Sequence, residues 1–413
     1  MRNTTVSRSP SRGYAVAAGT LGWALDAFDF FVVVFMVDAL AAHFQVAKSS
    51  VIWTLTATLA MRPLGALLFG LVADRYGRRK PMMAAVAYFS LIEVLSGLAV
   101  NFPMFLALRA LYGIGMGGYW GVGASMAMES SPPHRRGLLS GLLQGGYPAG
   151  YLLAAVAARV ILPIWGWRPM FWAGLLPAAI TLYITYRAPE SEAWRQHRQP
   201  SFGAIVRVVL DHRGSFGYLL LLLTLMIFLS HGTQDLYPDF LKNAHHMTPS
   251  VVAYLAMLYN LGAVLGTVFV GHSSERLGRR RGIVVSLTLC LLVIPAWAFG
   301  YSLAMLAAGA FLMQAGVQGA WGVIPAHLNE LSPDAARSLF PGLIYQLGVL
   351  FGSPTNTIEY ALRSRLGYEW ALAVFEGCTI LILILMFALG PERKGKSFLK
   401  EPVEADAILK ETL

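Results

Sequence analysis

Twelve long apolar stretches alternate with shorter polar segments along the chain. A helix rises about 1.5 Å per residue, so about 20 apolar residues cross the roughly 30 Å hydrocarbon core of a bilayer. The pattern therefore predicts an all-α membrane protein with twelve transmembrane helices. The stretches cover residues 14–40, 51–73, 80–101, 103–128, 138–162, 167–187, 215–241, 250–273, 282–300, 302–327, 338–362 and 367–389.

The polar segment 188–214 separates the first six stretches from the last six. We therefore expect an N-terminal six-helix bundle at 1–187, a cytoplasmic central loop at 188–214, a C-terminal six-helix bundle at 215–389 and a cytoplasmic tail at 390–413. The first stretch is too long for the apolar core of a signal peptide, so we expect a retained helix. The charged tail is expected to be flexible.

Composition supports a membrane protein and explains the charge. Hydrophobic residues make up 56% of the chain and charged residues 13%, whereas a soluble domain has about 25% charged residues. Of the 32 Lys and Arg residues, 24 fall in the termini, the central loop and alternate short loops, and six fall in the other loops. This bias predicts cytoplasmic termini in a multi-pass protein of the plasma (inner) membrane. Because the net charge of +10 does not gather on a soluble domain, no nucleic-acid partner is expected.

The two halves of the chain are copies of each other. Residues 70–80 read GLVADRYGRRK and residues 271–281 read GHSSERLGRRR, an offset of 201. The same offset relates further matching residues through all six helices, which predicts a parallel duplication. These matches are Trp120-Gly121 with Trp321-Gly322, Glu129 with Glu330, Arg136 with Arg337, Gly141-Leu142 with Gly342-Leu343, and Gly166 with Gly367.

With the loop at residues 70–80 and its copy at residues 271–281, the chain resembles the major facilitator superfamily over essentially its whole length. The resemblance implies a secondary transporter whose halves rock about a site near the bilayer midplane. It also implies a charge lock on the cytoplasmic side, because an acidic group near a helix end can pair with basic residues or with a neighbouring helix N-terminus. The expected gating residues are Asp74, Arg75, Arg78, Glu275, Arg276 and Arg279.

Two carboxylates, Asp26 and Asp29, lie three residues apart on one face of the first helix. Burial favours the neutral form of a carboxyl group, which suits a residue that binds and releases a proton. We expect Asp29 to couple transport to protons, whereas Asp26 fits coupling and a structural ion pair equally well. Arg109 begins an R-x-x-x-G-x-G pattern similar to that of proton-coupled members, although a structural role fits it as well. Glu93 is a further coupling candidate.

Arg62 lies halfway along the second helix. A guanidinium group is a planar fork that binds a carboxylate through two parallel hydrogen bonds, which a lysine ammonium cannot do. We interpret Arg62 as the anchor for an anionic substrate. The alternative is a structural ion pair with Asp26 or Asp29.

The seventh helix carries a polar stripe made of Ser230, His231, Gln234 and Asp235. An ionisable residue in the membrane costs at least about 2.5 kcal/mol on insertion scales, so it usually faces a cavity or a partner. Because this helix begins in the cytoplasm, the stripe belongs to the outer half of the membrane. We expect it to line the outer wall of a cavity, with substrate selection as its first role and proton relay as its second.

Three segments narrow the resemblance: GWALDAFDFF in the first helix, the surroundings of Arg62, and SHGTQDLYP in the seventh helix. Together they are similar to the sialate:proton symporter family, in its lactate and short-chain monocarboxylate branch. The branch pattern N-x-x-S/T-H-x-S/T-Q-D-x-x-x-T is matched except at Ile227 and Asp239. The resemblance implies proton-coupled uptake of lactate or a similar short monocarboxylate. We expect a functional monomer.

Other polar residues lie on helices that face the cavity in this superfamily, and helix packing is the alternative role for each. The expected lining residues are Tyr119, Gln144, Gln314, Gln318, Trp321 and Asn356. Glu376, within the last helix, is a lesser candidate for proton coupling.

The nearest alternative function is a proton symporter for aromatic acids or sialic acid, because these carriers share the two aspartates of the first helix. A drug or metabolite efflux carrier is less favoured, since Gly146 stands where the antiporter pattern G-P-x-x-G-G needs proline. A membrane-embedded enzyme is disfavoured because the histidines show no H-E-x-x-H spacing and both cysteines are isolated. No cofactor or metal is expected.

Overall fold

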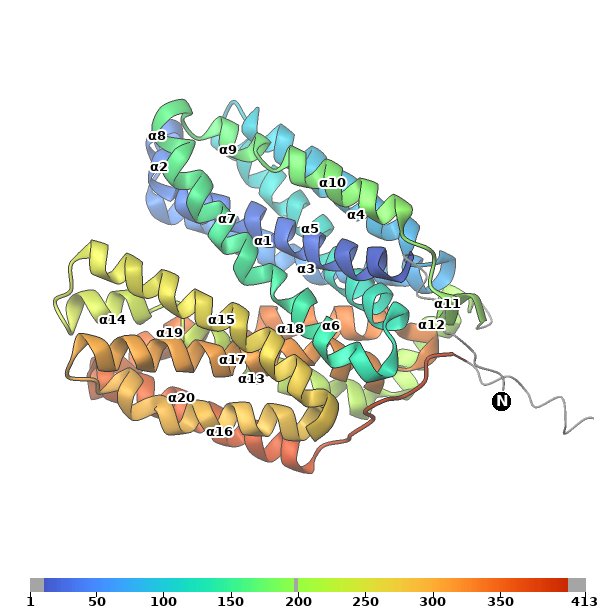
Figure 1. Ribbon diagram of the computed structural model, residues 1–413. Coiled ribbons are helices and arrows are strands. Elements are labelled where there is room, and N and C mark those ends of the chain that lie inside the picture. The colour runs from blue at the N-terminus through green and yellow to red at the C-terminus, as the bar shows by residue number, and fades with distance from the viewer. Residues whose placement is uncertain (1–10, 197–199, 400–413) are drawn as a thin grey trace, which may run out of the picture.

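The computed structural model describes residues 11–196 and 200–399, which form helices with no strand among them. Figure 1 shows two elongated helix bundles, with the first half of the chain (blue to green) above the second half (yellow to red). This arrangement confirms the predicted all-α fold of twelve membrane-spanning helices in two six-helix halves.

The first half contains the six predicted spans, three of which are divided into shorter helices. They are α1 (Ser11–Phe35) with α2 (Val37–Phe44), α3 (Lys48–Tyr76), α4 (Arg79–Gly97), α5 (Phe102–Ser130), α6 (Arg136–Gln144) with α7 (Gly146–Val160) and α8 (Leu162–Trp165), and α9 (Arg168–Trp172) with α10 (Leu175–Arg187).

The second half repeats the arrangement, with two of its spans divided. They are α13 (Arg213–Gly232) with α14 (Tyr237–Asn243), α15 (Pro249–Leu277), α16 (Arg279–Ala298), α17 (Leu303–Leu331), α18 (Leu339–Gly352) with α19 (Thr355–Leu366), and α20 (Tyr368–Leu389). Between the halves, the segment expected to be a loop contains two short helices, α11 (Glu192–Gln196) and α12 (Phe202–Asp211).

Two of the divided spans, the first and the fifth, have divided counterparts in the second half. The first span breaks at Met36 and its counterpart breaks between Gly232 and Tyr237, while the fifth breaks at Gly145 and its counterpart at Ser353 and Pro354. Breaks in paired spans are typical of transporters, in which interrupted helices surround the binding site. The broken spans therefore indicate where a site should lie.

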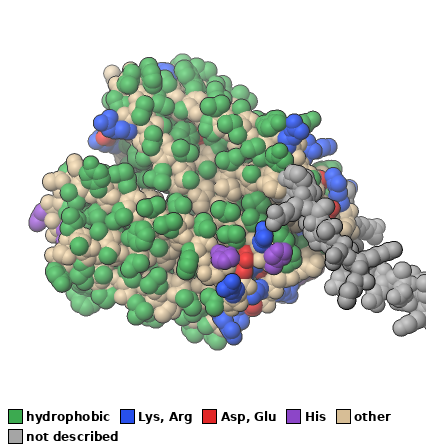
Figure 2. Space-filling model, viewed as in Figure 1, with side chains coloured by type: hydrophobic (Ala, Val, Ile, Leu, Met, Phe, Trp, Pro, Cys, Tyr) green, Lys and Arg blue, Asp and Glu red, His purple; other side chains and the backbone are tan. Residues whose placement is uncertain are grey.

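The outer surface is suited to lipid. Eight helical stretches among the described residues are long and apolar enough on their own to cross a membrane. Figure 2 shows hydrophobic side chains over most of the visible face, and Phe269 and Leu292 are each 73% exposed. Large apolar side chains remain this exposed where hydrocarbon replaces water. The chain is a multi-pass membrane protein.

Glycines bring α3 and α5 into close contact. A Cβ atom at Gly117 would lie 2.0 Å from the carbonyl oxygen of Arg62, and one at Gly113 would lie 2.1 Å from that of Thr58. Helix packing of this kind, through small residues, is common in membranes. It also fixes the height of Arg62 relative to α5.

Replacing Gly117 with alanine should destabilise the protein by about 1 to 3 kcal/mol, because the added methyl group has no room and the helices must separate. The measurement is the midpoint of thermal unfolding in detergent. Gly217→Ala is the matched control, since nothing lies within 4 Å of a Cβ atom at that helical position. Equal midpoints for the two variants would contradict the close packing.

Candidate functional site

A cavity of about 440 Å³ lies between the two halves. Its walls come from α1 and α3 in the first half, from α13, α17 and α19 in the second half, and from the broken span α6–α7. This volume is in the range of small-molecule sites. The residues that α3 contributes, Ile52, Leu55, Thr56 and Leu59, all belong to its outer half.

The polar stripe of the seventh span forms one wall of this cavity. His231 Nδ1 lies 2.9 Å from Asp235 Oδ2, and Asn356 Nδ2 donates to the same oxygen at 3.0 Å. Gln318 Nε2 donates to Ser230 Oγ at 3.2 Å. The stripe is therefore held in place by side chains from two other spans and presents a fixed polar surface to the cavity.

Aromatic rings form the floor of the cavity. Tyr345 stacks on Trp120 with ring centroids 4.3 Å apart, and Trp321 meets Tyr345 edge-on at 5.8 Å. Trp23 packs against Tyr147 at 5.3 Å. Trp120 and Trp321 are related by the offset of 201, so the duplication places one tryptophan from each half at the floor.

Arg62 lies beneath this floor, one turn further inward on α3 than Leu59. Its side chain is 3% exposed and its Cζ atom is 6.0 Å from the Tyr345 ring. Arg62 does not line this cavity, because the aromatic floor covers it, and its role as the anion anchor stays a prediction. Its Nε and Nη2 atoms have no hydrogen-bond partner in the part of the chain that the structure describes.

Asp26 shares this buried compartment with Arg62. It is fully buried, it interacts electrostatically with Arg62, and both of its carboxylate oxygens lack a hydrogen-bond partner among residues 11–196 and 200–399. The two side chains thus face the same compartment without forming a direct hydrogen bond. An incomplete pair of this kind leaves room for a third group.

Asp29 belongs to a different cluster within the first half. Arg109 donates to Glu93 Oε1 at 3.0 Å and to Ser96 Oγ at 2.6 Å, and its guanidinium stacks over Tyr112 at 4.6 Å. Asp29 interacts electrostatically with both Glu93 and Arg109. Of the roles considered for Arg109, the structure places it in an ion pair with Glu93, away from the cavity wall.

Most of the other predicted lining residues are found in the cavity wall, but two are not. Tyr119 is buried and donates to the Ala18 carbonyl oxygen, and Gln314 donates to Thr233, so both pack helices within one half. The structure places eight predicted residues on the wall: Gln144, Ser230, His231, Gln234, Asp235, Gln318, Trp321 and Asn356.

Four tyrosines of the cavity wall were not predicted. They are Tyr147, Tyr151, Tyr259 and Tyr345. Tyr147 and Tyr151 are four residues apart, and this spacing on a glycine-rich helix was the available signal.

Several residues predicted for the charge lock lie at the opposite end of the molecule, the end that the sequence predicts to face the cytoplasm. In the first half, Asp74 pairs with Arg78 at 3.0 Å and accepts hydrogen bonds from the backbone N–H groups of Ser338 and Leu339, both at 2.9 Å. These groups stand at the N-terminus of α18. A carboxylate is stabilised there by the exposed donors and the helix dipole. Asp74 therefore joins the two halves.

The second half repeats part of this arrangement with its own residues. Glu275 accepts a hydrogen bond from the Leu138 N–H at 3.0 Å, near the start of α6. Arg279 pairs with Glu330 at 3.1 Å. An acidic side chain thus meets the N-terminus of a helix in both halves, at positions that the offset of 201 relates.

Two ion pairs cross between the halves, and they were not among the predicted gating residues. Glu330 binds Arg136 of the first half at 3.0 Å, and Glu129 binds Arg337 of the second half at 3.1 Å. The offset of 201 relates both acids and both arginines. Their match in the repeat was the signal that could have identified them.

Arg75 and Arg276 lie beside the lock. Arg75 donates to the Pro200 carbonyl oxygen at 2.9 Å, and Arg276 is exposed, with its own carbonyl oxygen accepting from Lys394. These contacts are with the central segment and the tail, and the part of both arginines in the lock stays a prediction.

The family model described as Major Facilitator Superfamily matches residues 20–237 and 220–411, once for each half. The chain belongs to the major facilitator superfamily. A double-tryptophan mutant of XylE from Escherichia coli superimposes with a TM-score of 0.78 at 20% identity, covering 94% of this chain and 98% of that one. This likeness shows the shared fold.

Two curated relatives extend the comparison. The chain is 29% identical over 379 residues to the carboxylic acid transporter protein homolog of Saccharomyces cerevisiae, covering 85% of this chain and 61% of the relative. It is 26% identical over 396 residues to the sialic acid transporter NanX of Escherichia coli, covering 94% of this chain and 96% of the relative. The chain thus spans less than two thirds of the yeast protein and nearly all of the bacterial one.

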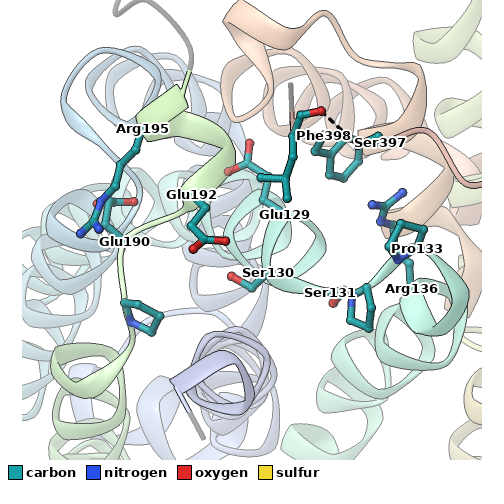
Figure 3. A pocket seen from close by; sticks show the side chains of 13 residues that line it. Glu129, Ser130, Ser131, Pro133, Arg136, Glu190, Glu192, Arg195, Ser397 and Phe398 are labelled. Atoms are coloured by element: carbon teal, nitrogen blue, oxygen red, sulfur yellow. Dashed lines mark hydrogen bonds between the residues drawn. The ribbon is translucent and has the colours of Figure 1, made fainter. Parts of the chain in front are cut away.

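Contacts join the two halves around Asp74 and Glu330, and the cavity lies toward the other end of α3, an arrangement that we interpret as an outward-facing state. Residues 390–399, at the start of the tail, contribute to the closure. The expectation of a flexible tail is therefore corrected for these residues. Figure 3 shows Phe398 between the two halves, near Glu129 and Arg136. Its ring lies 3.9 Å from Arg136 Cζ and 4.3 Å from Arg337 Cζ. The rest of the tail lies outside the described residues.

Lys396 fastens this segment further. Its carbonyl oxygen accepts from Arg136 at 2.9 Å and its Nζ atom lies 2.8 Å from Asp334 Oδ1. Partial burial acts to raise the pKa of Asp334, but the hydrogen bond from Lys396 and the charge of Arg337 outweigh it and hold that pKa below its usual range. Asp334 therefore remains a charged anchor for the tail at neutral pH.

Cysteine labelling should report the positions found for two glutamines. In a Cys290→Ser and Cys378→Ser background, Gln234→Cys should react with a membrane-impermeant maleimide added outside, because it lines the cavity. Gln314→Cys should react at least about tenfold more slowly, since it is buried against Thr233 and a buried thiol is unreactive. Equal rates would contradict the outward-facing arrangement.

Proposed function

We propose that the protein takes up lactate or a similar short monocarboxylate together with a proton, by alternating access. The observation that carries this proposal is the buried compartment of Arg62 and Asp26, in which guanidinium donors and both carboxylate oxygens lack partners within residues 11–196 and 200–399. A free guanidinium edge suits an organic carboxylate, because Nε and Nη2 donate in parallel to its two oxygens.

Charge balance connects the anion to a proton. Arg62 and an ionised Asp26 together carry no net charge, so an entering carboxylate makes the compartment negative. Uncompensated charge is unfavourable in a low-dielectric interior. A proton on Asp26 restores neutrality, and the loaded carrier can then change conformation. Asp29, in the neighbouring cluster with Glu93 and Arg109, is the alternative residue for binding the proton.

The path to Arg62 passes the outer wall and the aromatic floor. His231 and Asn356 offer hydrogen-bond donors to an incoming acid, and Asp235 keeps the histidine oriented. The substrate must then displace the ring of Tyr345 to reach the guanidinium. Closure of the rings above the bound acid would occlude it before the inner lock opens.

The relatives support a carboxylate as the substrate class. One is named as a carboxylic acid transporter homolog and another as a sialic acid transporter. Sialic acid or an aromatic acid remains the second candidate, because the cavity of about 440 Å³ is larger than a three-carbon acid requires.

Uptake of labelled lactate into proteoliposomes tests the proposal. An inward proton gradient should drive accumulation, and unlabelled lactate should compete more strongly than benzoate or sialate. Accumulation that requires a sodium gradient, or none at all, would contradict proton symport. Stronger competition by sialate or benzoate would favour the second candidate.

A further inference from the structure

A second pair of carboxylates lies inside the C-terminal half. Glu359 on α19 is 2% exposed and Glu376 on α20 is fully buried. None of their four carboxylate oxygens has a hydrogen-bond partner among the described residues. Glu376 was a lesser candidate for proton coupling from the sequence, whereas Glu359 was not predicted.

Gly232, the last residue of α13, allows the two carboxylates to approach each other. A Cβ atom at this position would lie 1.9 Å from Oε1 of Glu376 and 3.0 Å from Oε1 of Glu359, so these oxygens are within about 5 Å of each other. Two ionised carboxylates at this separation repel strongly in a low-dielectric interior. At least one of them must therefore hold a proton.

Among the described residues, the groups that act electrostatically on the pair supply no balancing positive charge. From α16, Cys290 faces Glu376, and from the break after α13, Asp235 faces Glu359, each near enough to interact electrostatically. Asp235 is itself paired with His231. The neighbours of the pair are thus acidic or neutral, which favours proton binding.

The basic residue nearest in sequence to Glu359 forms its ion pair with a different acid. Arg363, one turn further along α19, pairs with Asp239 at 3.0 Å. A metal ion is a poor alternative occupant, because Ca²⁺ takes about six to eight oxygen ligands and no group of three or more His, Cys, Asp or Glu side chains suited to a metal occurs among the described residues. The proton is the cation that this site fits.

We propose that Glu359 and Glu376 form a second proton-binding site, within the C-terminal half, that is loaded from the outer cavity by way of Asp235. The inference rests on the proposed function, since this proton travels with the carboxylate. One proton in the N-terminal half balances the substrate anion. A second proton in the C-terminal half makes each cycle carry one net positive charge inward.

The dependence of lactate accumulation on membrane potential tests directly whether each cycle carries a net positive charge inward. In proteoliposomes of the full-length protein at a fixed proton gradient, steady-state lactate accumulation should rise about tenfold when a potential of about 59 mV, interior negative, is imposed with potassium and valinomycin. Glu376→Gln and Glu359→Gln should each remove this dependence on potential while pH-driven accumulation remains measurable. Glu369→Gln, at the outer end of α20, is the control that should keep the dependence. Accumulation by the wild type that ignores the potential would overturn the proposal, as would variants that keep the dependence.

A measurement without transport separates this proposal from the proposed function. Infrared spectroscopy of the purified protein, titrated with pH in the absence of substrate, should show a carboxylic acid C=O band that weakens in Glu376→Gln and in Glu359→Gln but not in Glu369→Gln. An unchanged band in both variants would overturn the second proton site, whether or not lactate is the substrate. If lactate is not transported but the band is lost, the site stands and only the proposed substrate fails.

Discussion

Replacing Arg62 with lysine should weaken lactate binding at least about 100-fold and abolish measurable uptake. The change keeps the positive charge but removes the planar pair of donors, Nε and Nη2, that we expect to hold the substrate carboxylate. Each hydrogen bond to a charged group contributes about 1.5 to 3 kcal/mol, and about 1.4 kcal/mol corresponds to a tenfold change in affinity. The measurement is calorimetric binding of lactate to the purified protein, followed by uptake in proteoliposomes.

Arg159→Lys provides the matched control, because Arg159 is exposed on α7. It should bind and transport like the wild type. If Arg62→Lys also bound lactate with unchanged affinity, Arg62 would be a structural partner of Asp26 and not the anion anchor.

Glu330→Gln should shift the protein out of the outward-facing state. Glu330 is fully buried and binds Arg136 and Arg279, one from each half. The neutral amide leaves two buried guanidinium groups without their counter-charge, and breaking a buried ion pair in this way costs about 3 to 5 kcal/mol. Because the Arg136 contact exists only while the inner lock is closed, opening the lock relieves part of this cost.

A cysteine at Ser338 should reveal this shift. Ser338 is buried in the closed lock beside Ser125, so in inside-out vesicles Ser338→Cys should react slowly with a maleimide. Adding Glu330→Gln should raise the labelling rate by at least about tenfold, the change that corresponds to about 1.4 kcal/mol. Asp211→Asn, exposed on α12, should leave the rate unchanged. No increase with Glu330→Gln would contradict the gating role of the crossed ion pairs.

The sequence was sufficient for the features that depend on local pattern and on the repeat. The twelve spans follow from apolar length, and the polar stripe of the seventh span follows from helical spacing. The candidate lock residues follow from the duplicated loop. The four residues of the cross-half pairs Glu129–Arg337 and Glu330–Arg136 were visible as matched positions, although their pairing was not predicted. These features need only the period of a helix and the offset of 201.

Other features depend on how the helices cross and on which conformation is present. Spacing places Arg62 at mid-span, but it cannot show that the ring of Tyr345 from the other half covers it in this packing. Tyr119 lies on a glycine-rich helix, and no pattern shows that its hydroxyl group bonds to α1 and not to a ligand. Glu359 approaches Glu376 beside Gly232, the last residue of α13, and spacing along the sequence cannot reveal such a contact between three helices.

The most direct test of proton-coupled carboxylate uptake measures both fluxes together. Lactate is added outside proteoliposomes that contain a trapped pH-sensitive dye, at equal starting pH on both sides and without sodium, and labelled lactate is followed in parallel. The interior should acidify as lactate enters, well above the rate in vesicles that carry Arg62→Lys, because each anion brings a proton with it. Lactate that accumulates through the wild type with no more acidification than in those vesicles would contradict proton symport.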